Sequence, residues 1–427
     1  MFIMNVYKKD LIPIFILGGV NIFTLFLFII SPFNYLYGNA YLSFVYVSIN
    51  IGFLFFGYFL SVLFFGSKKY RLTKLYKTKS DTQLFGFLLI FYFLTFIFRY
   101  AYLLKFQFYD LDGIFNEILL GVADPKYGYL SMLDNTKAFT LPWSVYVFIS
   151  IFHSLFFISG AIFWKKLSLM NRLFFLLFIF LEAIFWYSRG TNFGVISLII
   201  IFFLSYLLNM NKINFKSFSY ILLLIFSIII VFSGIMYSRM GDISDLSSYE
   251  IYMTSINYDS YIFKSTPDFL KPTLLTFFSY LTQGYYFLSF GFDLDFKFSY
   301  FLSSNPALIN IGGLLGLDNT ENSYVHRLSN FGIDPNIQWH SAYLWIANDF
   351  SFYFVPLYVS LLGFGLGISW IFATRSNDFV FKVIFVILGG SIVFLFANNN
   401  FISSYLYLYI FMFFLSLLKI YFLIKRG

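Results

Sequence analysis

Arg189 has the side chain and the setting that most directly suggest chemistry. It lies in Ser188-Arg189-Gly190-Thr191-Asn192, a short polar turn between two apolar stretches. Its guanidinium group presents a rigid fork of N–H donors that matches the oxygens of a phosphate group. An arginine that only reaches toward lipid headgroups is the alternative explanation. We expect Arg189 to bind phosphate.

Two further ionisable residues, Arg99 and Glu182, lie inside apolar stretches at matching depths. An unpaired charge at such a position costs several kcal/mol, so we predict a buried ion pair between them. Glu182 also precedes Arg189 by seven residues, which places it on the same helical face, roughly 10 Å deeper. We expect it to orient or charge-balance the Arg189 site. His153, also in an apolar stretch, is expected to be a core histidine.

A second group of candidates lies in residues 237–349, which hold 11 acidic and five basic residues and two of the three histidines. A solvated loop is the alternative explanation for each residue in this segment. Several polar or aromatic residues in it could bind a ligand or transfer a proton. They are Arg239, Gln283, Tyr285, Tyr286, Arg327, Trp339, His340 and Asp349.

The elements that position these residues are membrane helices. Mean hydropathy is +0.79, charged residues make up 11% of the chain, and phenylalanine and tyrosine number 66 and 35. This composition is typical of a polytopic membrane protein whose helices face lipid. The chain has no cysteine, which excludes disulfides and thiolate chemistry. We predict an all-α fold, with residues 1–427 forming one integral membrane domain.

Hydropathy predicts about ten transmembrane helices. Lysine and arginine gather after the second, fourth and sixth helices and at both ends of the chain, so these parts and both termini are predicted to be cytoplasmic. The net charge of +8 is explained by this topology and does not indicate nucleic acid. The predicted helices are 11–30, 42–66, 84–104, 141–164, 173–187, 193–208, 217–236, 352–373, 379–397 and 401–423.

Residues 237–349 then form a large loop on the outer, periplasmic face. Within it, residues 273–292 are apolar enough for an eleventh span, but Gln283 and Gly284 interrupt them. An extra span would move the basic C-terminus outside, so we predict a helix that is interfacial or re-entrant. The fifth and sixth helices, of 15 and 16 residues, rise only about 22–24 Å against a hydrocarbon thickness near 30 Å. Arg189 is therefore expected below the outer surface.

In several motifs the chain resembles the bacterial O-antigen and oligosaccharide repeat-unit polymerases, which share a fold with the O-antigen ligases. The resemblance covers about residues 170–375, and the first 170 residues agree only in hydropathy. Family members often have glycine after the Asp349-Phe350 pair, whereas this chain has Ser351. The motifs are Ser188-Arg189-Gly190, Thr282-Gln283-Gly284-Tyr285-Tyr286, the tract from Trp339 to Phe350, and Gly363, Gly365 and Gly367.

The resemblance implies transfer of a growing glycan from undecaprenyl pyrophosphate to a newly flipped lipid-linked repeat unit, without a metal or other cofactor. The site would lie at the outer face of the inner membrane, and a polysaccharide chain-length regulator is a conceivable partner. Arg189, Arg239 and Arg327 would stabilise the pyrophosphates. His340, with an ordinary pKa, would be the general base, and Asp349 would replace or orient it. Trp339, Tyr285 and Tyr286 would stack on sugars.

This hypothesis places the chemistry at the two membrane-proximal ends of the large loop, where Arg239 and residues 340–349 can meet Arg189. Three alternatives remain open. An O-antigen ligase would use a similar set of residues. A flippase or other transporter of the lipid-linked glycan would need ionisable groups at the membrane midplane, of which the chain has few. A metal-assisted glycosyltransferase would use the paired carboxylates Asp110 and Asp112.

Overall fold

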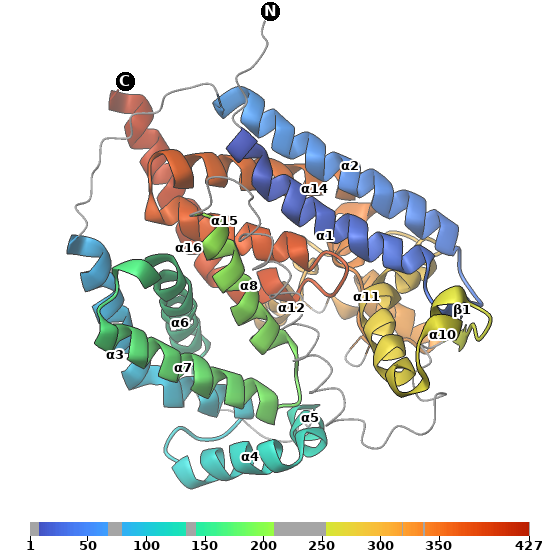
Figure 1. The fold of residues 1–427 in the computed structure, drawn as a ribbon, viewed down its shortest axis with the longest axis horizontal. Helices are drawn as coiled ribbons and strands as arrows, with labels where there is room; N and C mark the ends of the chain where they lie inside the picture. Colours follow the sequence, from blue (N-terminus) through green and yellow to red (C-terminus); the bar gives the residue numbers. More distant parts are fainter. Residues whose placement is uncertain are drawn as a thin grey trace, which may run out of the picture. The chain divides into compact units, whose positions relative to one another are not determined.

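The computed structural model describes residues 8–66, 79–133, 142–208, 253–317, 319–335 and 338–426. The predicted seventh span, 217–236, and Arg239 lie outside these residues. Among the described residues, β structure is limited to two short paired strands, and the rest of the regular structure is helical (Figure 1). The predicted all-α membrane fold is confirmed at this level.

Seven helices in the described part of the chain are long and apolar enough to cross a membrane, and each coincides with a predicted span. Predicted spans 193–208 and 379–397 form shorter apolar helices, so the total of ten and the orientation remain predictions. The seven are α1 (Ile12–Ile29), α2 (Ala40–Phe65), α3 (Lys79–Leu104), α6 (Trp143–Phe163), α7 (Leu169–Ser188), α14 (Ala342–Arg375) and α16 (Asn400–Arg426). The shorter two are α8 (Phe193–Leu207) and α15 (Phe379–Val393).

The remaining elements are short, apart from α11 (Lys271–Gly291). The short α-helices are α4 (Leu111–Ala123), α5 (Pro125–Leu133), α10 (Tyr261–Ser265), α12 (Pro306–Leu314) and α13 (Tyr324–Arg327). Single 3-10 turns occur at Lys8–Leu11, Trp164–Lys166, Asp268–Leu270, Thr320–Asn322 and Leu328–Phe331. The strands β1 (Phe33–Tyr35) and β2 (Thr254–Ile256) pair antiparallel, with Phe33 opposite Ile256.

The described residues fall into two compact units, each built from segments far apart in the sequence. Unit 1 draws on Met1–Lys69, Ile243–Phe372 and Ile387–Leu406, and unit 2 on Tyr70–Asp242, Ala373–Val386 and Tyr407–Gly427. His340 and Asp349 belong to unit 1. Arg99, Glu182 and Arg189 belong to unit 2.

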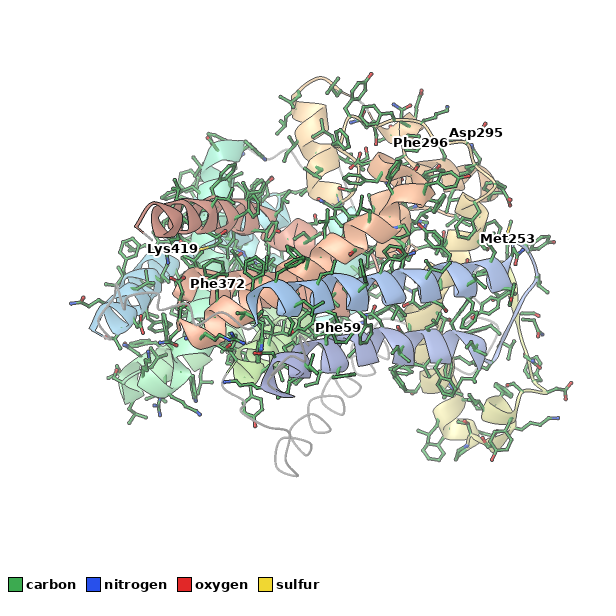
Figure 2. All side chains as sticks on the ribbon, turned by 90° about the horizontal axis from the view of Figure 1, so that it is seen from above. Phe59, Met253, Asp295, Phe296, Phe372 and Lys419 are labelled. Atoms are coloured by element: carbon green, nitrogen blue, oxygen red, sulfur yellow. The ribbon has the colours of Figure 1, made fainter. Side chains whose placement is uncertain are left out.

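In unit 1, α1, α2 and α11 pack against one another. Every residue of α11 from Thr282 to Gly291 is buried, so this half of the helix is enclosed on all sides. An interfacial helix would keep one face in contact with lipid headgroups or water. The packing therefore does not fit an interfacial helix, and the re-entrant arrangement of residues 273–292 stays a prediction. By contrast, α2 exposes large apolar side chains such as Phe59, as expected for contact with lipid (Figure 2).

Helix α14 is interrupted at Ser351, where φ is 54° and ψ is 164°. A straight helix of 34 residues would rise about 51 Å, well beyond the hydrocarbon thickness of a bilayer. The interruption separates the polar tract up to Phe350 from an apolar part that begins at residue 352. This is where the sequence predicts that the eighth span begins.

In unit 2, two ion pairs join the ends of different helices. Lys166 Nζ lies 2.6 Å from Asp81 Oδ2, and Lys419 Nζ lies 2.5 Å from Asp378 Oδ2. All four residues are near ends predicted to be cytoplasmic. The short helices α4 and α5 instead pack on α7, at the end that carries Arg189.

Candidate functional site

The turn that carries Arg189 ends α7 with a residue in left-handed conformation. The backbone N–H of Gly190 donates to the carbonyl of Tyr187 at 2.8 Å, and φ of Gly190 is +57°, a value that favours glycine. Helices α4 and α5 pack closely against this turn, and each does so at a glycine. A Cβ atom at Gly121 or Gly128 would overlap the carbonyl oxygen of Ser188. The close packing of three glycine positions therefore fixes the turn.

Arg189 is only 9% exposed, and no hydrogen bond or ion pair joins its guanidinium group to any described residue. The guanidinium carbon lies 5.3 Å from the ring centre of Trp186 and 5.7 Å from that of Phe185. Burial lowers the pKa of Arg189 to about 10, so the side chain stays protonated at neutral pH. The result is a buried cation that faces aromatic rings and lacks an anionic partner in the described part of the chain.

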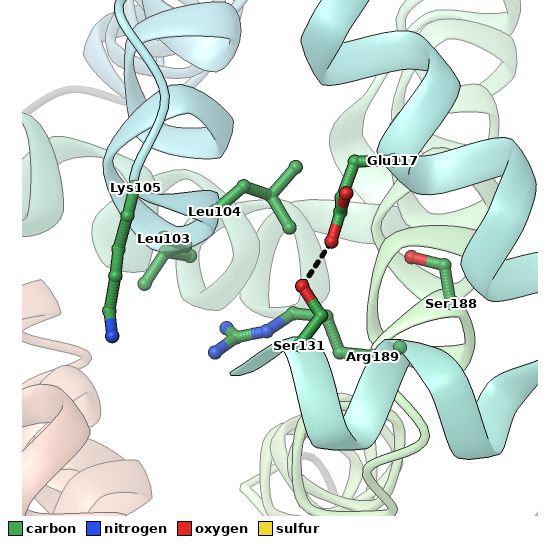
Figure 3. A pocket seen from close by; sticks show the side chains of 8 residues that line it. Leu103, Leu104, Lys105, Glu117, Ser131, Ser188 and Arg189 are labelled. Carbon is green, nitrogen blue, oxygen red and sulfur yellow. Dashed lines mark hydrogen bonds between the residues drawn. The ribbon is translucent and has the colours of Figure 1, made fainter. Parts of the chain in front are cut away.

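Arg189 lines a small pocket between the end of α7 and helices α4 and α5. Glu117 on α4 accepts a hydrogen bond from the hydroxyl of Ser131 on α5, and its carboxylate points into the pocket (Figure 3). The hydroxyl of Tyr127 donates to the same carboxylate at 3.4 Å. The pocket thus combines cations, a carboxylate and hydroxyl groups. Its lining residues are Leu103, Leu104, Lys105, Glu117, Gly128, Ser131, Ser188 and Arg189.

The predicted ion pair between Arg99 and Glu182 is confirmed, at 2.6 Å from Nη1 to Oε1. The hydroxyl of Tyr92 also donates to Glu182, at 3.1 Å, and Trp186 donates its Nε1–H at 2.9 Å. Glu182 therefore neutralises Arg99 and holds the indole ring that faces Arg189. Glu182, about two helical turns before Arg189, supports the pocket in this way.

His153 is a core histidine, as predicted, because it is 2% exposed and packs on the ring of Tyr92. Its Nε2 shares a hydrogen bond of 2.8 Å with the hydroxyl of Thr95.

In unit 1 the structure places the tract around Gly284 on α11 next to the tract around His340. A Cβ atom at Gly284 would lie 2.9 Å from the backbone nitrogen of Ser341 and 3.1 Å from the carbonyl carbon of His340. The missing side chain of Gly284 therefore lets α11 approach the His340 backbone. Asn398, which the sequence analysis did not single out, accepts from the His340 backbone N–H at 2.7 Å and from Trp345 Nε1 at 3.1 Å.

The His340 side chain is fully buried, and neither ring nitrogen has a hydrogen-bond partner among the described residues. Burial lowers the pKa of His340 to about 3, whereas the proposed general base was expected to have an ordinary pKa. The imidazole is therefore neutral at pH 7 but a weak base in this conformation.

The carboxylate of Asp349 accepts hydrogen bonds from a loop of unit 1. It accepts from the Ser299 hydroxyl at 2.6 Å, from the Ser303 backbone N–H at 3.0 Å and from the Ser304 backbone N–H at 2.6 Å. Tyr300 and Phe301, in the same loop, both have positive φ, at 58° and 60°. Asp349 thus holds a strained loop, and among the described residues these bonds replace the expected contact with His340.

The expected stacking of Tyr285 and Tyr286 on sugars does not fit this structure, because both side chains are fully buried. The Tyr285 hydroxyl is 2.9 Å from Thr24 Oγ1, and the Tyr286 hydroxyl donates to the Met253 carbonyl at 2.8 Å. Gln283 is buried beside them. These three residues build the core of unit 1.

Two other predicted ligand residues remain partly exposed in unit 1. Trp339 packs its ring against Tyr280, with the ring centres 5.2 Å apart. Arg327 donates to the backbone carbonyl of Asp295 at 2.6 Å. Trp339 and Arg327 are therefore accessible to a ligand, although Arg327 already has one acceptor.

Asp110, one of the paired carboxylates of the metal-assisted alternative, caps the N-terminus of α4. Its side chain accepts from the backbone N–H of Gly113 at 2.9 Å, which gives it a structural role. Asp112 is exposed in the first turn of the same helix.

Sequence reasoning missed Lys105, Glu117 and Ser131, which reach the pocket only through the packing of α4 and α5. The signal available in the sequence was the carboxylate of Glu117, which lies among the apolar residues in the second half of α4. No family model matches the chain, and neither a curated protein nor a solved structure matches it significantly.

Proposed function

We propose that the protein is a membrane glycosyltransferase that polymerises oligosaccharide repeat units linked to undecaprenyl pyrophosphate. One observation carries the proposal: Arg189 is a buried cation without a carboxylate partner among the described residues, and it lines an open pocket together with Lys105. A buried charge without a partner is costly, so its retention calls for an anionic ligand. A pyrophosphate linked to a membrane lipid has the matching charge.

The reaction needs little from the protein besides charge stabilisation and proton removal. The acceptor hydroxyl attacks the anomeric carbon of the donor glycan, and the bond from that carbon to the pyrophosphate oxygen breaks. The electron pair leaves with the lipid pyrophosphate, whose developing charge Arg189 and Lys105 stabilise. The hydroxyl proton passes to a base.

His340 remains the proposed base, with one condition from its surroundings. Its pKa of about 3 must rise for it to accept a proton near neutral pH, and this requires water or substrate to reach the buried ring. Asp349 is reassigned from catalysis to support of the loop that it binds. Arg239 and Arg327 stay proposed contributors to anion binding.

The proposed location is the outer face of the inner membrane, with both termini in the cytoplasm. Donor and acceptor are lipid-linked oligosaccharides in the surrounding bilayer. A polysaccharide chain-length regulator is the protein partner proposed for this function.

A glycan ladder from cells that carry Arg189→Ala tests the proposal. A polymerase variant leaves surface glycan of a single repeat unit. A flippase variant leaves no surface glycan, and a ligase variant leaves long chains attached to the lipid carrier. Arg172→Ala, near the opposite end of α7, is the matched control and should give a normal ladder. A normal ladder from Arg189→Ala at normal protein levels would overturn the proposal.

A further inference from the structure

Helix α4 exposes an apolar stripe along its length. At 3.6 residues per turn, four exposed apolar residues of α4 fall within an arc of about 80°. This apolar stripe consists of Leu111, Phe115, Leu119 and Val122, and Leu119 is the most exposed of them at 64%. Contact between water and a continuous apolar surface is costly, so the stripe calls for an apolar partner.

The other faces of α4 have different surroundings. The buried face packs on α3 and α7. Its residues are Ile114, Glu117 and Gly121. Asp112 and Asn116 are exposed and lie on the far side of the apolar stripe from this buried face. A protein-facing side, an apolar stripe and a polar side, in this order around the helix, are typical of a helix that lies in a membrane interface.

An aspartate stands at each end of α4. Asp110 accepts from the backbone N–H of Gly113 at 2.9 Å, and Asp124 accepts from the backbone N–H of Lys126 at 3.0 Å. Both aspartates are exposed, and a carboxylate in the hydrocarbon core of a bilayer is costly, so neither end of α4 can lie deep. The 13 residues of α4 rise only about 20 Å, too little to cross a bilayer. A helix with these two ends fits a membrane only when it lies along the surface.

The helices on which α4 packs supply the membrane. Both α3 and α7 are long and apolar enough to cross one. Each exposes large apolar side chains, among them Phe93 on α3 and Phe180 on α7. Ile114 of α4 belongs to the same cluster of packed side chains as Tyr100 of α3 and Phe185 of α7. The bilayer around α3 and α7 is therefore the apolar medium nearest to the stripe.

We propose that α4 lies in the headgroup region of the leaflet around the C-terminal end of α7, with its apolar stripe in contact with acyl chains. By the predicted topology this is the outer leaflet. Because α4 contains no lysine or arginine, the contact is apolar and needs no anionic lipid. The Ser188-Arg189 turn, against which α4 packs, is thereby held near the lipid headgroups. This inference goes beyond the proposed glycosyltransferase activity and does not depend on it.

The chain has no cysteine, so a single introduced cysteine can carry a fluorescent NBD label that reports on its environment. The test compares Leu119→Cys, in the apolar stripe, with Asn116→Cys, on the polar side of the same helix. Each labelled full-length protein is placed at one copy per nanodisc of phosphatidylcholine. The label at position 119 should emit at a shorter wavelength than the label at position 116.

Two quenchers then locate the labels. Doxyl groups near the top of the acyl chains should quench the label at position 119 at least about twofold more than the label at position 116, because the apolar face of an interfacial helix lies about 5–10 Å into the boundary between headgroups and acyl chains. Iodide in the water should quench the label at position 116 more. Phe115→Cys, one turn earlier in the stripe, repeats the comparison if Leu119→Cys does not fold.

Strong quenching of both labels by iodide, with none by the doxyl lipids, would place the stripe in water and contradict the proposal. Protection of the label at position 119 from both quenchers would mean that protein covers the stripe, which also contradicts it. Nanodiscs with added phosphatidylglycerol should give the same quenching as those of phosphatidylcholine alone. A requirement for the anionic lipid would assign the contact to headgroup charge instead of acyl chains.

Discussion

Asp349 in unit 1 and Arg189 in unit 2 are both buried charged residues next to the end of an apolar stretch, yet their surroundings differ. The carboxylate of Asp349 accepts hydrogen bonds from Ser299, Ser303 and Ser304, which leaves it little capacity for a ligand. The guanidinium group of Arg189 has aromatic rings beside it and no described acceptor. A buried charge whose partners are all internal stabilises the fold, whereas one without internal partners is available to bind.

Among the variants that test this comparison, Asp349→Ala is expected to change the stability of the protein most. It leaves the two buried backbone N–H groups of Ser303 and Ser304 without their acceptor, which costs about 3–5 kcal/mol of unfolding free energy. Thermal unfolding of the purified protein should show a large fall in Tm. Asp268→Ala is the control, since Asp268 is 94% exposed and its partner among the described residues is the neighbouring Lys271. An unchanged Tm for Asp349→Ala would contradict the stabilising role of Asp349.

Glu182→Gln should have the next largest effect, about 3 kcal/mol, because it leaves Arg99 as a buried charge without its partner. The variant keeps a hydrogen-bond acceptor for Trp186, so the loss should come from charge. A double variant with Arg99→Met removes both charges and should recover much of the stability. If Glu182→Gln and the double variant are equally unstable, the two residues are not coupled.

The pH dependence of stability tests whether His340 is buried as a neutral imidazole. Its pKa of about 3 in the folded state lies below the ordinary value of about 6.5 that the unfolded chain has. The unfolded state therefore binds the proton first, and the stability that is present above pH 6.5 is lost as pH falls toward 3. Between pH 6.5 and pH 5 the loss should be about 2 kcal/mol. Denaturant unfolding should show a flatter pH dependence for His340→Gln, and an equal slope in both proteins would contradict the buried, neutral imidazole.

Ser351→Gly should change stability least, and it should raise stability where the other variants lower it. Ser351 has φ of 54° in the middle of α14, a conformation that is strained for any residue except glycine. Replacement by glycine should stabilise unit 1 by about 1 kcal/mol and raise Tm slightly. Ser369→Gly, in a regular part of α14, should instead lower Tm, because glycine disfavours a helix interior. A lower Tm for both variants would show that the break at Ser351 carries no strain.

Hydropathy was sufficient to predict most of the helices, since burial in lipid requires long apolar stretches with satisfied backbones. The ion pair of Arg99 with Glu182 was also predictable, because two opposite charges at one depth have few other partners. Ser351 is a related case. Members of the polymerase family that the chain resembles often have glycine at this position, and the positive φ of Ser351 is a conformation that favours glycine.

The parts of the site that were not predictable depend on contacts between distant segments. Glu117 and Lys105 reach Arg189 only because Gly121 and Gly128 let two short helices pack on the Ser188 carbonyl. The donors that surround Asp349 come from a loop about 50 residues earlier, in which Tyr300 and Phe301 adopt positive φ against their usual preference. No local pattern in the sequence indicates either arrangement.

The glycine contacts at the end of α7 also bear on how the protein responds to its lipid environment. Membrane helices usually adapt to a thicker or thinner bilayer by tilting, and side chains near their ends move relative to the headgroups. Backbone contacts with α4 and α5 hold the Ser188-Arg189-Gly190 turn at a fixed height within unit 2. A change in acyl-chain length should therefore deform the lipid around the unit and leave the depth of the guanidinium group relative to its pocket unchanged.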